Sequence, residues 1–159
     1  MKTLVIFYSL EGNCALIADI LKSSLNAEVL EIKLQDERKR SRFGKFFWAL
    51  SLTFSKKKIA LKPYTVNIEN YDLIILGAPV WAGAPAPIMA SFLDQTKITG
   101  KKTGLFCTHG GGVRNALEKF ETLLPGNTIA GKIDFVNPSQ ADKAGLKQKI
   151  DDWVKTLGG

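Results

Sequence analysis

The chain has 159 residues and a formal net charge of +7, a length that predicts one domain, residues 1–159, with an apolar core. Hydrophobic residues make up 45% and charged residues 23%, which excludes disordered and fibrous classes. Two cysteines and one histidine, far apart in the sequence, exclude a disulfide framework and a zinc site, so we predict no metal. The chain starts directly on a strand-like run without a signal-peptide cleavage site, and no apolar run approaches the roughly 20 residues that span a bilayer. We therefore expect a cytoplasmic protein.

Apolar runs and helical patterns alternate along the chain. In chain order they predict a strand over 3–8, a helix from residue 13, strands over 28–32 and 71–76, a helix over 85–94, a strand over 103–107, a helix over 113–124, a strand over 128–136 and a closing helix over 139–157. In the closing helix, Ile150, Val154 and Leu157 are expected to face inward. Strands that are apolar on both faces and separated by helices predict a doubly wound parallel sheet with helices on both faces. Ligands bind such a sheet beyond the carboxyl ends of its strands, where three glycine-containing loops are expected to lie.

Positive charge is concentrated between Asp36 and Lys62, which we call the basic segment. It holds nine lysines and arginines against two acidic residues, and the rest of the chain is neutral overall. Within it, the stretch from Phe46 to Phe54 has only Ser51 and Thr53 as polar residues. We predict that residues 36–62 are an insertion before the third strand, and that their charge serves a surface or a partner rather than the fold.

The loop after the first strand, Ser9-Leu10-Glu11-Gly12-Asn13-Cys14, has the features of a phosphate-binding turn. Gly12 can adopt a positive φ, and the N–H groups of the helical turn that follows attract an anion. Ser9 and Asn13 add side-chain donors, whereas Glu11 is expected to point outward because its carboxylate would repel a phosphate. The signature Gly-x-x-x-x-Gly-Lys-Ser/Thr is absent, which excludes an ATPase or GTPase. Taken alone, this loop could equally be an ordinary helix cap.

Three loops together resemble the FMN-binding loops of the flavodoxin family. Ser9 to Cys14 is similar to the phosphate loop of that family, although Cys14 stands where the family usually has threonine and supplies a weaker donor. Residues 77–87, GAPVWAGAPAP, resemble the second flavin loop, and residues 106–112, FCTHGGG, resemble the third. The resemblance covers nearly the whole chain outside the basic segment. It implies a flavodoxin-like α/β fold with a five-stranded parallel sheet of strand order 2-1-3-4-5, and FMN as the cofactor.

The resemblance also implies roles for individual residues. Trp81, expected on the loop after the third strand, would stack on the isoalloxazine ring, and a peptide near Ala82 and Gly83 would accept a hydrogen bond from flavin N5. The third loop would offer backbone N–H groups to the pyrimidine end of the flavin. The residues expected to bind FMN are Ser9, Leu10, Glu11, Gly12, Asn13, Cys14, Pro79, Val80, Trp81, Ala82, Gly83, Thr108, His109, Gly110, Gly111 and Gly112. No catalytic residue is assigned.

His109 and the two cysteines are each open to two interpretations. His109 could donate a proton near the flavin edge, but we favour a loop residue that contributes its backbone, because titratable groups near a site are often structural. Cys14 at a helix N-terminus could have a lowered thiol pKa. Since a neighbouring phosphate would cancel this effect, we interpret Cys14 as a packing residue. Cys107, at a strand end, is expected to be buried and inert.

Three interpretations compete for the basic segment. Our preferred one is a helical lid that packs its apolar face beside the flavin. The segment could instead dock an acidic redox partner, or bind anionic lipid or nucleic acid. We expect no nucleic acid, because every other signal belongs to a flavin-binding fold. Membrane contact through residues 38–58 ranks below the lid.

Two functions remain, and resemblance of fold does not choose between them. The leading prediction is an FMN-binding electron-transfer protein that works with a redox partner protein or reductase. The alternative is an enzyme, an FMN-dependent NAD(P)H or quinone oxidoreductase in which the basic segment shapes the substrate pocket. A third class, a flavin-free interaction module, predicts a protein that does not take up FMN.

Overall fold

The computed structural model describes residues 1–36, 42–55 and 58–158. Predictions on Arg38, Lys39, Arg40, Lys56 and Lys57 of the basic segment fall outside these ranges. The elements, in chain order, are β1 (Thr3–Phe7), α1 (Asn13–Leu25), β2 (Glu28–Glu31), α2 (Arg42–Phe54), the 3₁₀ turn η1 (Ile68–Asn70), β3 (Leu73–Trp81), β4 (Ala84–Pro85), α3 (Pro87–Gln95), β5 (Lys102–His109), α4 (Ala116–Thr122), β6 (Thr128–Val136), the 3₁₀ turn η2 (Pro138–Gln140) and α5 (Lys143–Leu157).

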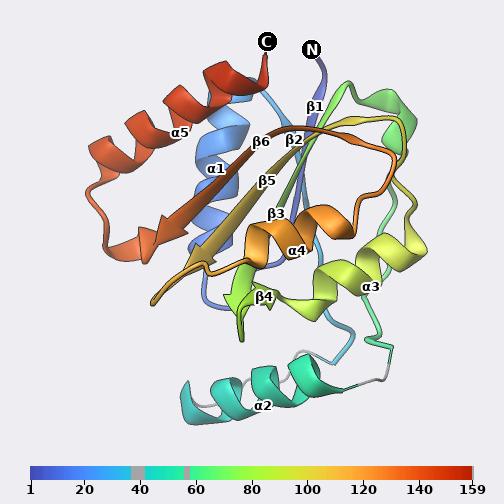
Figure 1. Ribbon diagram of the computed structural model, residues 1–159, viewed down its shortest axis with the longest axis vertical. Helices are drawn as coiled ribbons and strands as arrows, with labels where there is room; N and C mark the ends of the chain where they lie inside the picture. The colour runs from blue at the N-terminus through green and yellow to red at the C-terminus, as the bar shows by residue number, and fades with distance from the viewer. Residues whose placement is uncertain (37–41, 56–57, 159) are drawn as a thin grey trace.

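The sheet has the predicted parallel topology. Its parallel strands lie in the order β2-β1-β3-β5-β6, which is 2-1-3-4-5 when these five strands are numbered along the chain. The two-residue strand β4, which was not predicted, pairs antiparallel with the end of β3. Figure 1 shows α1 and α5 on one face of the sheet and α3 and α4 on the other. The doubly wound α/β fold is therefore confirmed.

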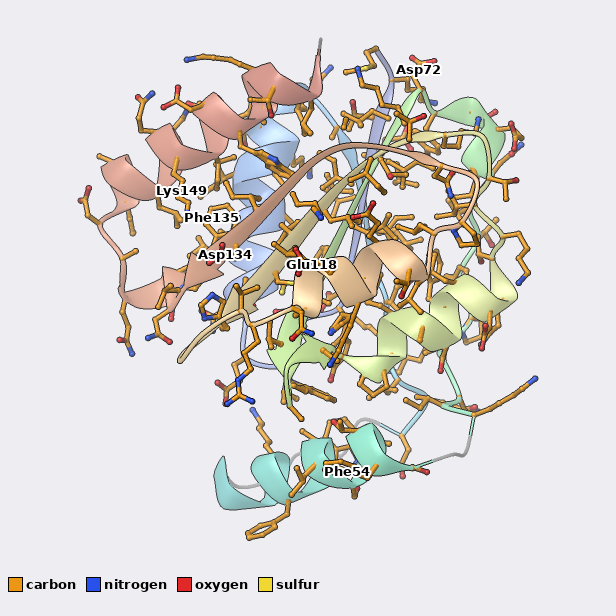
Figure 2. All side chains as sticks on the ribbon, viewed as in Figure 1. Phe54, Asp72, Glu118, Asp134, Phe135 and Lys149 are labelled. Atoms are coloured by element: carbon orange, nitrogen blue, oxygen red, sulfur yellow. The ribbon has the colours of Figure 1, made fainter. Side chains whose placement is uncertain are left out.

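Two apolar clusters fill the two faces of the sheet. Successive residues of β1 alternate between them: Leu4 and Ile6 belong to the cluster under α3 and α4, whereas Val5 and Phe7 belong to the cluster under α1 and α5. Burial on both faces explains why the central strands read as continuous apolar runs. At the edge strand β6, the ammonium of Lys149 in α5 lies 5.0 Å from the centre of the Phe135 ring (Figure 2).

Strand β3 is longer than predicted, because Gly77-Ala78-Pro79 does not end it. Its pairing with β1 ends at Gly77, whereas its pairing with β5 continues to Pro79 opposite Thr108. The carbonyl of Pro79 accepts a hydrogen bond from Ala86 N (2.9 Å). This bond lies on the side of β3 that faces β1, beyond the last residue of β3 that pairs with β1. In a strand, the nitrogen and the carbonyl of one residue point to the same side. The nitrogen of Pro79 therefore faces the side where pairing with β1 has ended, so its missing N–H costs no hydrogen bond between β3 and β5.

Helices α4 and α5 begin later than predicted. Before α4, Arg114 has a φ of +50°, which interrupts a continuous helix from Val113. Helix α5 begins after Asp142, whose carboxylate caps it by accepting a hydrogen bond from Gly145 N (2.7 Å). Its buried residues include Ile150 and Leu157, as expected, whereas the predicted Val154 is only partly buried. The remaining inward positions are taken by Leu146 and Trp153.

The two ends of the basic segment pair with each other where the segment joins the rest of the domain. Leu34 and Leu61 form an antiparallel bridge, and two backbone hydrogen bonds flank it, from Gln35 N to Ala60 O (3.0 Å) and from Lys62 N to Lys33 O (2.8 Å). Its helix α2 lies across the end of the sheet toward which the arrows of β5 and β6 point (Figure 1). The segment therefore places a helix beside the carboxyl ends of the strands.

The close approach of β3 and β5 generates a stability prediction. A Cβ at Gly77 would lie 1.9 Å from Cζ of the buried Phe106 ring. Since overpacking costs about 1–3 kcal/mol, we expect Gly77→Ala to lower the free energy of unfolding by at least about 2 kcal/mol in urea denaturation. Adding Phe106→Leu should recover part of this loss.

Gly111→Ala is the matched control, because nothing lies within 4 Å of a Cβ there. It should change the free energy of unfolding by less than about 0.5 kcal/mol. Equal stability of Gly77→Ala and Gly111→Ala would contradict the steric argument.

Candidate functional site

A cleft of about 220 Å³ opens at the carboxyl ends of β1, β3 and β5. It is lined by Ser9, Leu10, Glu11, Asn13, Cys14, Pro79, Val80, Trp81, Thr108, His109, Gly110 and Asn137. All of these except Asn137 belong to the predicted set. The other predicted residues, Gly12, Ala82, Gly83, Gly111 and Gly112, lie in the same loops without lining the cleft. The three loops thus meet at one place, as the parallel sheet requires.

The first loop forms the N-terminal end of α1 around the hydroxyl of Ser9. Gly12 has a φ of +88°, and Ser9 Oγ accepts hydrogen bonds from Gly12 N (3.1 Å) and Ala15 N (3.3 Å). The hydroxyl proton of Ser9 stays available for another acceptor, because both of these bonds are accepted. The first N–H groups of a helix have no acceptor within it and favour an anion. None of the residues that line the cleft is a lysine or arginine.

Asn13 connects this loop to η2, the turn that follows β6. Its Oδ1 accepts a hydrogen bond from Ser139 N (3.2 Å), which leaves its Nδ2 as the donor group of that side chain. Asn137, which sequence reasoning missed, lines the cleft from the same direction and has a φ of +40°. Its place directly after the last strand is the one signal that could have identified it.

Trp81 is the last residue of β3 and not a loop residue as predicted. It pairs with Ala84 of β4, and the turn between them has positive φ at Ala82 (+50°) and Gly83 (+72°), as tight hairpin turns require. The indole contacts two aromatic rings edge-on: Tyr8 at 5.8 Å and 89°, and Trp48 of α2 at 6.3 Å and 71°. The two contacts hold Trp81 at the mouth of the cleft from two different elements.

Two basic residues that the sequence analysis did not select lie beside the turn at Gly83, Lys119 of α4 and Arg114, which precedes that helix. Lys119 Nζ donates a hydrogen bond to Gly83 O (3.0 Å). A Cβ at Gly83 would lie 3.3 Å from Cδ of Arg114, so a side chain at this position would press on that arginine. A cation therefore lies beside the turn that is expected to face flavin N5.

His109 organises the third loop through both ring nitrogens. Its Nδ1 accepts a hydrogen bond from Gly112 N (2.9 Å), and its Nε2 lies 2.9 Å from Asp134 Oδ2. Because Nδ1 is an acceptor, the neutral ring carries its proton on Nε2 and donates it to Asp134. The side chain is only 6% exposed. These contacts give the His109 side chain a structural role in the loop, which goes beyond the backbone contribution that we favoured from the sequence.

Both cysteines are buried free thiols. Cys14 Sγ lies 3.1 Å from Thr108 Oγ1, and burial raises the pKa of the Cys14 thiol to about 12. Burial also raises the pKa of the Cys107 thiol. Neither thiol is activated, in agreement with a packing role for Cys14 and an inert Cys107.

Helix α2 borders a second cavity, which shares Trp81 with the cleft. It measures about 280 Å³ and is lined by Leu10, Glu11, Lys45, Ala49, Leu50, Thr53, Val80, Trp81 and Ala82. Leu10, Glu11, Val80 and Trp81 line the cleft as well, so the two spaces adjoin. A helix of the basic segment therefore lies next to Trp81, where the preferred interpretation places a lid, and it leaves a mostly apolar space there.

Two features are absent from the described residues, a metal-binding cluster and a membrane-spanning helix. No group of three or more histidine, cysteine, aspartate or glutamate side chains among them could hold a metal ion. No helix in the ranges 1–36, 42–55 and 58–158 has the length and apolar character needed to cross a membrane.

The chain was compared with known proteins. The sequence model of one family, described as Flavodoxin, matches residues 2–157. No curated protein matches the chain. Among solved structures, a flavoprotein from Lactobacillus acidophilus NCFM in complex with FMN is 24% identical, with a TM-score of 0.75 over 96% of this chain and 98% of that one.

Two further structures are similar. The apo form of the flavoprotein from Lactobacillus acidophilus NCFM is 26% identical, with a TM-score of 0.64 over 87% of this chain and 95% of the other. Oxidised flavodoxin 2 from Bacillus cereus is 21% identical, with a TM-score of 0.62 over 99% of this chain and 98% of the other.

The raised thiol pKa values generate a prediction about reactivity. At neutral pH Cys14, with a pKa of about 12, and Cys107 are protonated and buried, so neither should react with DTNB in the folded protein. Both should react fully once urea unfolds the chain, because free thiols titrate near pH 8.5. Fast labelling of either cysteine in the folded state near pH 8 would contradict the packing role.

Proposed function

Because the chain belongs to the flavodoxin family, we propose that it binds FMN in the cleft described above and acts as an electron-transfer protein. The observation that carries this proposal is the cleft itself, which has the N-terminus of α1 at one end and the indole of Trp81 at the other. FMN, when bound, supplies the redox chemistry, and the protein supplies binding, orientation and electrostatics.

The first loop would hold the phosphate without a basic side chain. Gly12 N and Ala15 N already donate to Ser9 Oγ, so the other N–H groups at the start of α1, the hydroxyl of Ser9 and Nδ2 of Asn13 would be the donors for a phosphate. Glu11 is exposed, but it also lines both the cleft and the second cavity, so that it does not simply point outward as predicted.

The second and third loops would hold the ring system. Trp81, braced by Tyr8 and Trp48, presents an aromatic surface, and His109 fixes the backbone around Gly112. The proposed FMN-binding residues are those that line the cleft, Asn137 included, together with Gly12, Ala82, Gly83, Gly111 and Gly112. Since Lys119 holds the Gly83 carbonyl, its charge would also favour negative charge on the nearby ring edge.

Proteins of this family transfer electrons to redox partners, and we propose a partner protein or reductase for this chain. We also propose that residues 1–159 form one domain that carries the basic segment as an insertion. Its two free cysteines are in keeping with a reducing compartment, for which we propose the cytoplasm.

The second cavity favours a second candidate function. A mostly apolar space beside Trp81, with Lys45 and Glu11 in its lining, could receive a small acceptor such as a quinone. The chain would then be an FMN-dependent NAD(P)H or quinone oxidoreductase.

The primary proposal is tested by titrating the purified chain with FMN and with riboflavin, which lacks the phosphate. Asn13→Asp keeps the acceptor for Ser139 N but adds a negative charge at the phosphate loop. It should raise the Kd for FMN at least tenfold, about 1.4 kcal/mol, and leave the Kd for riboflavin unchanged. Trp81→Ala should raise the Kd for both ligands about tenfold, because ring stacking and buried apolar area are lost together. Trp81→Phe should restore most of the affinity.

The control for the added charge is Asn70→Asp, an exposed asparagine far along the chain from the loop, which should leave both Kd values unchanged. A colourless protein that binds neither ligand, or equal weakening of FMN and riboflavin by Asn13→Asp, would refute the proposed site.

The two candidate functions differ in how the protein is reduced. Rapid bleaching of the FMN-loaded protein by NADPH under anaerobic conditions would favour the enzyme, whereas reduction only through a reductase would favour the carrier. For an enzyme, Leu50→Trp should fill the second cavity and lower quinone turnover at least about tenfold without changing the Kd for FMN. Phe47→Trp is the control, because Phe47 is on the same helix but outside the cavity lining. This variant should reduce quinone at the wild-type rate.

A further inference from the structure

The outer side of α2 carries three large apolar side chains that remain exposed. Phe47 is 66%, Leu50 39% and Phe54 72% exposed, and their spacing of three and four residues puts them on one side of the helix. Figure 2 shows Phe54 on this helix, apart from the side chains of the sheet. The other side of α2 packs on the body through Trp48 and Leu52. A surface helix that is apolar on both sides indicates a binding surface on its outer side.

The sequence around this outer face is rich in positively charged residues. Between Glu37 and Glu69 the sequence contains nine lysines and arginines and no acidic residue. Lys58 and Lys62, which follow α2, are exposed. The rest of the chain has 13 basic and 15 acidic residues, so the positive potential of the protein originates in the segment that carries the exposed apolar side chains.

We propose that the outer face of α2 attaches this protein to an anionic lipid bilayer. Phe47 and Phe54 enter the boundary between headgroups and acyl chains, with Leu50 at the edge of this face beside the second cavity, while the lysines stay at the level of the headgroups. With 13 residues, α2 is shorter than the roughly 20 that cross a bilayer, so it lies in the plane of the surface. The inner face of the helix packs on the rest of the domain, as expected of a lid, and the outer face contacts the membrane.

Charge and area favour a bilayer over the other occupants of this face. A symmetric contact with a second copy would bring two segments of net charge +7 together. A stable protein partner usually covers about 800 Å² on each side, whereas one helix about 20 Å long offers much less. A bilayer accepts protruding aromatic side chains without a complementary shape, and anionic headgroups supply the opposite charge.

The test is sedimentation of the purified full chain with vesicles of phosphatidylcholine alone or with about one third phosphatidylglycerol, a composition that makes the surface anionic. The wild type should sediment with the anionic vesicles only, and less at about 1 M salt, where the Debye length is about 3 Å. The double variant Phe47→Ser, Phe54→Ser should bind at least about tenfold more weakly. Lys58→Gln with Lys62→Gln should weaken binding by about fivefold for each lysine.

Matched controls come from other surfaces of the chain. Val136→Thr alters an apolar residue that is 56% exposed outside α2, and Lys22→Gln with Lys143→Gln removes two exposed charges elsewhere. Both should sediment like the wild type, and all variants should keep the wild-type circular dichroism and FMN affinity.

Three results would overturn the proposal. The first is a wild type that stays in the supernatant with both vesicle types, and the second is equal sedimentation of the Phe47→Ser, Phe54→Ser variant and the wild type. The third is a concentration-dependent dimer that is lost in that variant while no vesicle binding occurs, which would assign the face to a second copy. If the first result is found and the protein is also a monomer, the face would be left to an acidic protein partner.

Discussion

The parallel pairing of β1, β3 and β5 is the constraint on which the whole cleft depends. Phe7 lies opposite Gly77, and Pro79 lies opposite Thr108, so the three loops start at the same end of the sheet. A shift of one residue in either register would exchange the side chains of the two faces. It would also separate Cys14 from Thr108, which are in contact at 3.1 Å. The buried core and the site are thus set by the same hydrogen bonds.

Within this frame, the proposed phosphate site and the basic character of the protein are separate. The lining of the cleft contains no lysine or arginine, so a bound anion there would be held by backbone N–H groups and neutral side chains. The excess positive charge belongs to the basic segment. Because the two features do not share residues, surface charge can vary without loss of the cofactor site.

Helix α2 connects the cofactor cleft with the basic segment. Its Trp48 meets Trp81 at 6.3 Å, its residues Ala49, Leu50 and Thr53 border the second cavity, and its outer face exposes Phe47 and Phe54. Attachment of that face to a bilayer would place the second cavity close to the lipid surface. An apolar electron acceptor dissolved in the membrane could then reach the neighbourhood of Trp81, whereas a water-soluble partner protein would have to approach from another side.

Much of the fold and most of the site could be predicted from the sequence alone, because both leave local signals. Apolar runs indicated where the strands lie, the family resemblance implied their order, and glycines within short motifs marked Ser9–Cys14, the turn at Gly83 and the loop at Gly110. What the sequence did not reveal depends on contacts between distant elements. Trp81 belongs to a strand because Ala84 pairs with it, Lys119 reaches Gly83 from α4, and Asn137 enters the cleft from the end of β6. Local pattern determines which segments form strands and helices, but only packing in three dimensions decides which side chains meet, since these partners lie far apart along the chain.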